Sequence, residues 1–182
     1  AQLPQAMVKK AYTFALSAVN RRLSQSKTPG EGDVAHALYA AYVLTAFPAE
    51  WNEVKTARED VQNWAAYADK YARFMTPLGQ TYAAAVFHRL GQEAKAQKYL
   101  DLVLSRLQDD PLTGAHFAPE PQSWVWYRDT LSTQTATLQT LLEIRPQAPQ
   151  TAAMARWLLF NGKATVGESP RSSAQAVFAL LN

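Results

Sequence analysis

The sequence contains no cysteine in 182 residues. This absence excludes disulfides, thiolate nucleophiles and cysteine-ligated zinc sites from the chain. It does not identify a cellular compartment, because many periplasmic and extracellular proteins also lack cysteine. Cysteine chemistry is therefore removed from the list of activities that this chain can carry.

β-Branched residues are scarce, whereas strong helix formers are abundant. The chain has 1 Ile and 11 Val against 32 Ala and 20 Leu. Alanine and leucine have the lowest free-energy cost in a helix, while β-branched side chains favour strands. The composition therefore predicts an all-α fold and nearly excludes β-sandwiches and doubly wound sheets.

Charged residues are also few, and neither sign dominates. They make up 18% of the chain, with 18 Lys and Arg against 15 Asp and Glu spread along its length. No basic stripe indicates nucleic-acid binding, and no long apolar run indicates membrane contact. An apolar content of 48% argues against disorder. We expect one soluble helical domain over residues 1–182, cut from a much larger multidomain protein.

Apolar residues recur in steps of three and four along the whole chain, interrupted by Pro and Gly clusters. This pattern is typical of consecutive helical hairpins. Asp33 is expected to cap the second helix at its N-terminus, and Pro170 to lie in the first turn of the last. The pattern predicts about eight helices, over residues 4–24, 33–44, 56–75, 78–90, 92–107, 130–142, 149–160 and 170–181.

The second, fourth and eighth predicted helices carry few charges, whereas most of the others are amphipathic. Such alternation is expected when one helix of each hairpin lines an inner ring and its partner covers the outside. A weak internal repeat aligns residues 133–142 with residues 172–181. We therefore expect paired hairpins that form an α/α toroid or a large part of one. In the last helix we expect one buried side, made of Ala174, Val177, Phe178 and Leu181.

Residues 109–127 interrupt this pattern with three Pro, one Gly and four aromatic residues. The segment is too long and irregular for a simple connector, so we expect an ordered loop. Loops of this kind often contain a functional site.

Several segments resemble the thioester-domain-like α/α toroid of bacterial alpha-macroglobulins. The likeness rests on the order and spacing of soft motifs, which are residues 37–44 (ALYAAYVL), 91–96 (GQEAKA), 124–134 (WVWYRDTLSTQ), 156–159 (RWLL), 162–163 (GK) and 172–181 (SSAQAVFALL). The resemblance implies a secreted or periplasmic protease-trapping protein in which this toroid lies among β-sandwich domains. Proteases and the other domains of the parent chain would be its partners. The reactive thioester of that family joins Cys and Gln in a Cys-x-Glu-Gln motif, which this segment does not contain.

The densest aromatic cluster lies within this irregular segment and consists of Phe117, Trp124, Trp126 and Tyr127. Aromatic side chains bury a large area at modest entropic cost, so the cluster either pins the loop over the ring or contacts a neighbouring domain. By the same resemblance, His116 would be the candidate for the histidine that assists acyl transfer in some thioester proteins, but without a cysteine it has nothing to activate. We expect His116 to be a loop-packing or surface residue.

The remaining polar residues do not form a recognisable catalytic or metal-binding pattern. His36 and His88 lack a third ligand at matched spacing. Glu120, Asp129 and Glu143 would have to converge in a central cleft to serve an enzyme. A hydroxyl-rich run on the sixth predicted helix faces inward without a nucleophile motif. We expect no catalytic residue, cofactor or metal. A stand-alone helical-repeat binding scaffold and an α/α-toroid enzyme are the alternative hypotheses.

Overall fold

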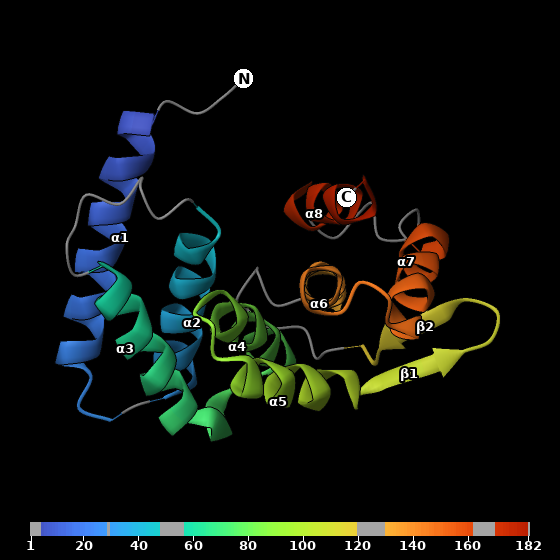
Figure 1. The fold of residues 1–182 in the computed structure, drawn as a ribbon, viewed down its shortest axis with the longest axis horizontal. Coiled ribbons are helices and arrows are strands. Elements are labelled where there is room, and N and C mark those ends of the chain that lie inside the picture. The colour runs from blue at the N-terminus through green and yellow to red at the C-terminus, as the bar shows by residue number, and fades with distance from the viewer. Residues whose placement is uncertain (1–4, 29, 48–56, 120–129, 162–169, 182) are drawn as a thin grey trace. The chain divides into compact units, whose positions relative to one another are not determined.

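The computed structural model of the chain describes residues 5–28, 30–47, 57–119, 130–161 and 170–181. These residues form eight α-helices, one short 3-10 helix and one two-stranded sheet (Figure 1). The prediction of an all-α fold with about eight helices is confirmed, with a small β-hairpin added. In chain order the elements are α1 (Gln5–Gln25), α2 (Glu31–Thr45), α3 (Ala57–Lys70), η2 (Ala72–Phe74), α4 (Pro77–Arg89), α5 (Glu93–Leu104), β1 (Leu107–Asp110), β2 (Gly114–Phe117), α6 (Thr130–Ile144), α7 (Pro149–Asn161) and α8 (Pro170–Leu181).

The chain divides into two compact units, residues 1–96 and 97–182, with the boundary inside α5. We call them unit 1 and unit 2. The sequence-based expectations of a single domain and of a closed toroid concern the arrangement of the whole chain, and both stay predictions.

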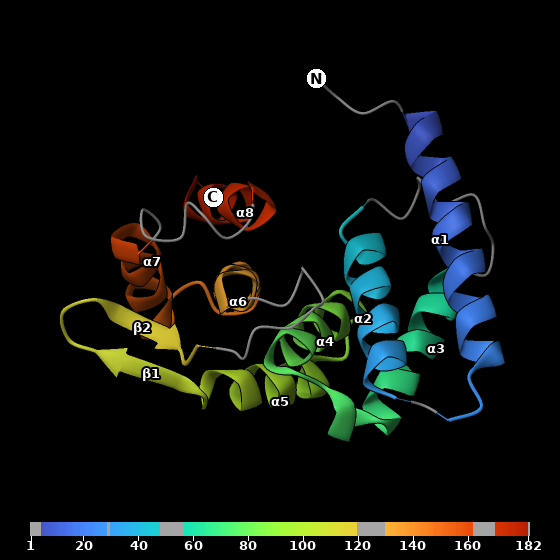
Figure 2. The same cartoon turned by 180° about the vertical axis from the view of Figure 1, so that it is seen from behind.

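In unit 1, α2 packs against α1, α3 and α4, as the two opposite views show (Figure 1 and Figure 2). Its buried residues are spaced by three and four, as expected for a helix that faces a core: Val34, Ala37, Leu38, Ala41 and Leu44. α4 is buried continuously from Leu78 to Phe87. This burial explains why those ten residues include no charged side chain, since an unpaired buried charge is very costly.

Contrary to the prediction from sequence, Asp33 is not the N-cap residue of α2. α2 begins at Glu31 with Gly30 as its N-cap, so Asp33 lies at the third helical position. Its carboxylate accepts a hydrogen bond from the Gly30 backbone N–H at 3.4 Å. Asp33 therefore does cap the helix, by reaching back from inside the first turn.

α3 is shorter than predicted, because η2 replaces its last turn. α4 begins at Pro77, one residue before the predicted start at Leu78. The Thr76 hydroxyl accepts a hydrogen bond from the Gly79 N–H at 3.1 Å, and Pro77 occupies the first helical position. Proline has no N–H to lose there, so this helix start is well specified by local sequence.

In unit 2, a β-hairpin replaces both the end of the predicted fifth helix and the start of the predicted loop. α5 ends at Leu104, and β1 pairs antiparallel with β2 in the register Leu107↔Phe117 and Asp110↔Gly114. The Asp110 carboxylate accepts hydrogen bonds from the backbone N–H groups of Leu112 (2.7 Å) and Thr113 (3.0 Å). Such side-chain-to-backbone bonds stabilise a tight turn.

α6 packs against α7, α8 and β2 (Figure 1). The predicted buried side of α8 is wrong. Ala174, Val177, Phe178 and Leu181 are all exposed, and Ala179 is the buried residue among the described side chains of this helix. Four apolar residues with helical spacing are therefore exposed on α8.

Candidate functional site

Gln134 connects α6 to the free edge of the hairpin. Its amide Nε2 donates to the Ala115 carbonyl at 2.8 Å, and its Oε1 accepts from the Phe117 N–H at 3.3 Å. Ala115 and Phe117 are separated by one residue, so both direct these backbone groups away from β1. The side-chain amide thus satisfies the strand edge as the peptide group of a third strand would. Gln134 is fully buried, which makes both bonds structurally important.

Gly114 brings the hairpin backbone into close contact with α7. Its φ is +102°, and a Cβ placed on it would lie 2.1 Å from the Ala153 carbonyl oxygen and 3.1 Å from the Trp157 nitrogen. Only glycine fits such a position without moving backbone atoms. The next residues of β2 are therefore fixed against α7.

His116 lies in β2, not in a loop as predicted. Its ring stacks on Trp157 of α7, with centroids 5.5 Å apart and planes 6° from parallel. The half-buried imidazole has Nδ1 3.5 Å from the Gly114 carbonyl oxygen. Its contacts are those of a packing residue that joins the hairpin to α7.

The predicted aromatic cluster lies only partly within the described residues. Phe117 is buried in unit 2, next to the strand edge that Gln134 satisfies. Trp124, Trp126 and Tyr127 lie outside the described residues, so their contact with a neighbouring domain stays a prediction.

The hydroxyl-rich run of α6 faces inward, as predicted. Ser132, Thr133 and Thr137 are buried together with Gln134. Two further hydroxyls, on Thr135 and Thr140, are buried without a hydrogen-bond partner among the described residues. A buried helix with polar side chains is held in one rotational position by the bonds that those side chains make.

An apolar stripe covers the outer face of α8. It consists of Ala174, Val177, Phe178 and Leu181, which have the i, i+3, i+4, i+7 spacing of a helix face that packs against protein. Val177 is 57% exposed and Leu181 is 79% exposed. α7 also exposes Leu159 and Phe160, each at 65%. Exposed large apolar side chains thus occur on both α7 and α8 of unit 2.

The predicted histidines His36 and His88 and the acid Glu143 lie on three different helices of the described chain. The His88 Nδ1 lies 2.9 Å from a carboxylate oxygen of Glu93 at the start of α5. His36 lies on α2, and Glu143 is exposed near the end of α6. Glu120 and Asp129 lie outside the described residues. Among the residues that the structure describes, no group of three or more His, Asp or Glu could hold a metal ion.

Hydrogen bonding lowers the pKa of two carboxylates. At Asp110, the backbone N–H groups of Thr113 and Leu112 hold the pKa below its ordinary value of 3.8. At Asp33, burial raises the pKa, but hydrogen bonds from Ser26, Arg22 and Gly30 outweigh it and the net pKa is lowered. Both carboxylates fix chain corners, so their ionised forms have structural roles.

No described helix combines the length and the hydrophobicity needed to cross a membrane. Comparison with known proteins gives no match to any family model, curated protein or solved structure. The arrangement of the described side chains is therefore the basis for assigning a function.

Sequence reasoning missed the hairpin and the outward direction of the α8 stripe. A signal for the hairpin was present, because Asp110, Pro111 and Gly114 are spaced as in a tight turn. No sequence signal gives the direction of the stripe, since a helical period identifies an apolar face but not what covers it.

Proposed function

We propose that this chain is a helical scaffold whose α8 stripe packs against another domain of a larger protein. On the resemblance of its motifs, the parent is an alpha-macroglobulin-like protease-trapping protein of the periplasm or extracellular space. The chain contributes a contact surface to that protein and performs no catalysis itself. The occupant of the stripe would be one of the β-sandwich domains that accompany such toroids.

The exposed stripe of α8 is the observation that supports this proposal. Full burial of a Val or Leu side chain stabilises a contact by about 1.5–3 kcal/mol. Val177 and Leu181 lie one helical turn apart on the same exposed face. Leu159 and Phe160 add exposed apolar area on α7 of the same unit. A partner domain over these side chains would remove them from water.

The test uses the protein encoded by the complete reading frame that contains this chain. A photo-crosslinking amino acid replaces Val177, and in a matched control it replaces the exposed Gln108 of β1. We expect crosslinks from position 177 to a β-rich segment of the same protein, and few from position 108. Crosslinks from position 177 to separate proteins alone would support the stand-alone scaffold instead. Equal crosslinking from both positions, or none, would refute docking through α8.

The protease-trapping part of the proposal has a separate test. The full-length protein is mixed with an active protease, whose activity is then measured on a small peptide and on a large protein substrate. Trapping predicts retained cleavage of the peptide and lost cleavage of the protein. Unchanged cleavage of both substrates, with the crosslinks at position 177 present, would remove the trapping role while keeping the scaffold role.

A further inference from the structure

A polar pocket of about 470 Å³ lies between α1 and α2 in unit 1, far along the chain from the α8 stripe. Pockets of this volume accommodate small molecules. The side chains that line it are mostly hydrogen-bond donors: Ala18, Arg21, Arg22, Gln25, Ser26, Asp33 and His36. Asp33 is the one acid among them.

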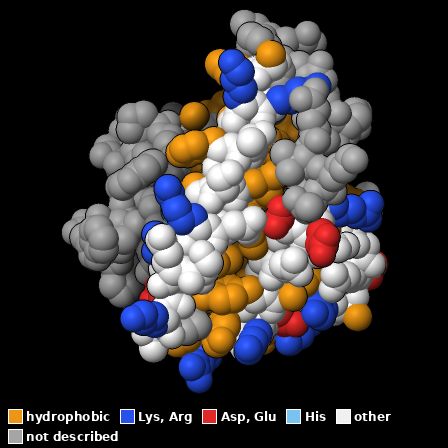
Figure 3. Space-filling view, turned by 90° about the vertical axis from the view of Figure 1, so that its left-hand side faces the viewer, with side chains coloured by type: hydrophobic (Ala, Val, Ile, Leu, Met, Phe, Trp, Pro, Cys, Tyr) orange, Lys and Arg blue, Asp and Glu red, His pale blue; other side chains and the backbone are white. Residues whose placement is uncertain are grey.

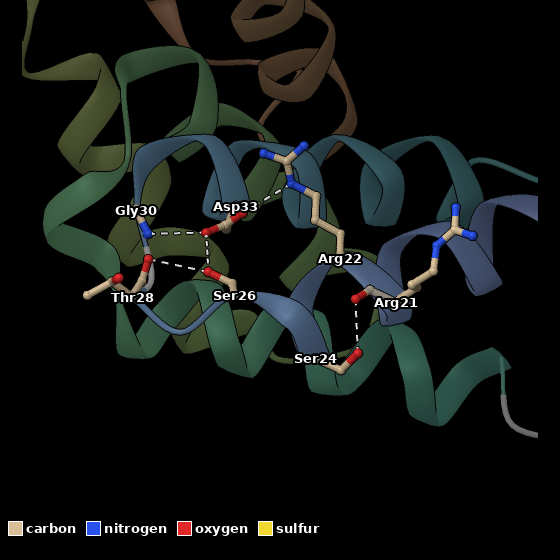
Figure 4. A network of polar contacts seen from close by, with 7 residues as sticks. All are labelled: Arg21, Arg22, Ser24, Ser26, Thr28, Gly30 and Asp33. Atoms are coloured by element: carbon tan, nitrogen blue, oxygen red, sulfur yellow. Dashed lines mark hydrogen bonds and ion pairs between the residues drawn. The ribbon is translucent and has the colours of Figure 1, made fainter.

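The negative charge of Asp33 is already satisfied inside the corner. Its Oδ1 accepts from Arg22 Nε at 3.0 Å, and its Oδ2 accepts from the Ser26 hydroxyl at 2.7 Å (Figure 4). The Gly30 N–H adds a third donor at 3.4 Å. The carboxylate thus fixes Arg22 and Ser26 in place.

Both arginines retain donors for a ligand. The bond from Arg22 to Asp33 uses Nε, which leaves the terminal nitrogens of that guanidinium outside this pair. The backbone carbonyl of Arg21 accepts a hydrogen bond from the Ser24 hydroxyl at 2.9 Å, and this bond is separate from the Asp33 network. In Figure 4 the Arg22 guanidinium lies beside Asp33, and the Arg21 guanidinium lies farther along α1. Both arginines line the pocket, together with one carboxylate, that of Asp33.

His36 and Gln25 add uncharged hydrogen-bond donors to the lining of the pocket. Partial burial and then the positive charge of Arg22 lower the pKa of His36, while Asp33 acts in the opposite direction. A neutral imidazole keeps one N–H donor. The space-filling view from the side of α1 and α3 shows Lys and Arg side chains distributed over unit 1 (Figure 3). The pocket is distinguished from that surface by two adjacent arginines with a hollow between helices.

We propose that this pocket binds a small ligand bearing a phosphate group. A phosphate monoester carries close to two negative charges at neutral pH and three strong acceptor oxygens, which suits two guanidinium groups. A carboxylate is satisfied by one guanidinium fork. Arg21 and the terminal nitrogens of Arg22 contact the phosphate oxygens, and Gln25 and His36 supply further donors. The rest of the ligand occupies the remaining pocket volume.

Isothermal titration at constant ionic strength tests this site, with inorganic phosphate and phenyl phosphate as probes and acetate and benzoate as carboxylate controls. We expect saturable binding of phenyl phosphate at least tenfold tighter than that of benzoate. Tighter binding of phenyl phosphate than of inorganic phosphate would identify the ligand as a monoester, and equal binding would identify it as free phosphate. Absence of saturable binding, or equal affinity for phenyl phosphate and benzoate, would overturn the proposal.

Variants locate the binding. Arg21→Gln should weaken phenyl phosphate binding at least tenfold while leaving the melting temperature of the free protein unchanged, because its guanidinium makes no bond in the corner network described above. Lys10→Gln removes the same charge from the same helix, about three turns away, and should change the affinity less than twofold. Equal losses in the two variants would show unspecific attraction to α1 and refute a pocket.

Discussion

Gly114 lies where the hairpin backbone comes closest to α7. Gly114→Ala combines an unfavourable positive φ with a Cβ 2.1 Å from the Ala153 carbonyl oxygen. We expect a loss of about 2–5 kcal/mol in the free energy of unfolding. Gly91 is the matched control, since its φ is +76° but no atom lies within 4 Å of the added Cβ. Gly91→Ala should cost about 1–2 kcal/mol. Urea denaturation measures both, and equal losses would contradict the close contact with α7.

Gln134 makes two hydrogen bonds to the edge of β2 that faces away from β1. Gln134→Leu leaves the Ala115 carbonyl and the Phe117 N–H buried without these partners, so we expect a loss of about 2–4 kcal/mol in the free energy of unfolding. Thr135→Val removes a buried hydroxyl that has no partner among the described residues, and should be neutral or stabilising. Thermal and urea unfolding measure the stability of both variants. A Thr135→Val variant less stable than Gln134→Leu would contradict these expectations.

Residue roles were predictable from sequence where they depend on neighbours along the chain. The inward direction of the α6 hydroxyl run and the cap at Thr76 follow from helical spacing and from the Thr-Pro pair. The partners of Gln134 and His116 were not predictable. Both contacts involve residues of the hairpin, which the helical pattern did not predict. Each contact also joins residues far apart in the chain.

At the scale of elements, the corner between α1 and α2 should respond to acid. The pKa of Asp33 is lower in the folded protein than its ordinary value of 3.8, so the folded state is stabilised above that pH. This stabilisation is lost as the pH falls through the lowered pKa. Asp33→Asn should therefore cost about 1–2 kcal/mol at pH 7, and the difference from wild type should shrink below pH 3.8. Urea denaturation across pH checks this, and a constant difference at every pH would be inconsistent with it.

The two faces of α8 should respond differently to the same substitution. Ala179 is buried, so Ala179→Glu should lower the free energy of unfolding by about 2–4 kcal/mol. Leu181 is exposed, so Leu181→Glu should change it by less than about 0.5 kcal/mol in the 182-residue chain. Calorimetry on both variants tests the direction of the helix, and the reverse order would show that the stripe faces inward.

Helix positions were predictable from sequence to within a few residues in most cases. α7 and α8 begin at Pro149 and Pro170 as expected, because proline favours a first helical turn. The fifth predicted helix continued to Leu107, which belongs instead to β1. Helical spacing in α5 continues directly into the strand without a Gly or Pro to mark the change. Leu107 pairs with Phe117, which the helical pattern around Leu107 does not indicate.

At the scale of the whole molecule, the two compact units carry different candidate surfaces. Unit 1 holds the donor-lined pocket between α1 and α2, and unit 2 holds the apolar stripe of α8. Composition was sufficient to predict the helical class, because Ala and Leu so strongly outnumber β-branched residues. Composition does not identify the partner of an exposed stripe, since it does not indicate what packs against an apolar helix face.

The proposed docking requires that another domain covers α8 in the full-length protein. Because the chain has no cysteine, Val177→Cys introduces a unique thiol whose labelling rate reports solvent access. Mass spectrometry can follow labelling at this position in the 182-residue chain and in the full-length protein. We predict labelling at least tenfold slower in the full-length protein, while Leu112→Cys in the hairpin turn labels rapidly in both. Equal labelling of Val177→Cys in the two proteins would contradict the docking of another domain on α8.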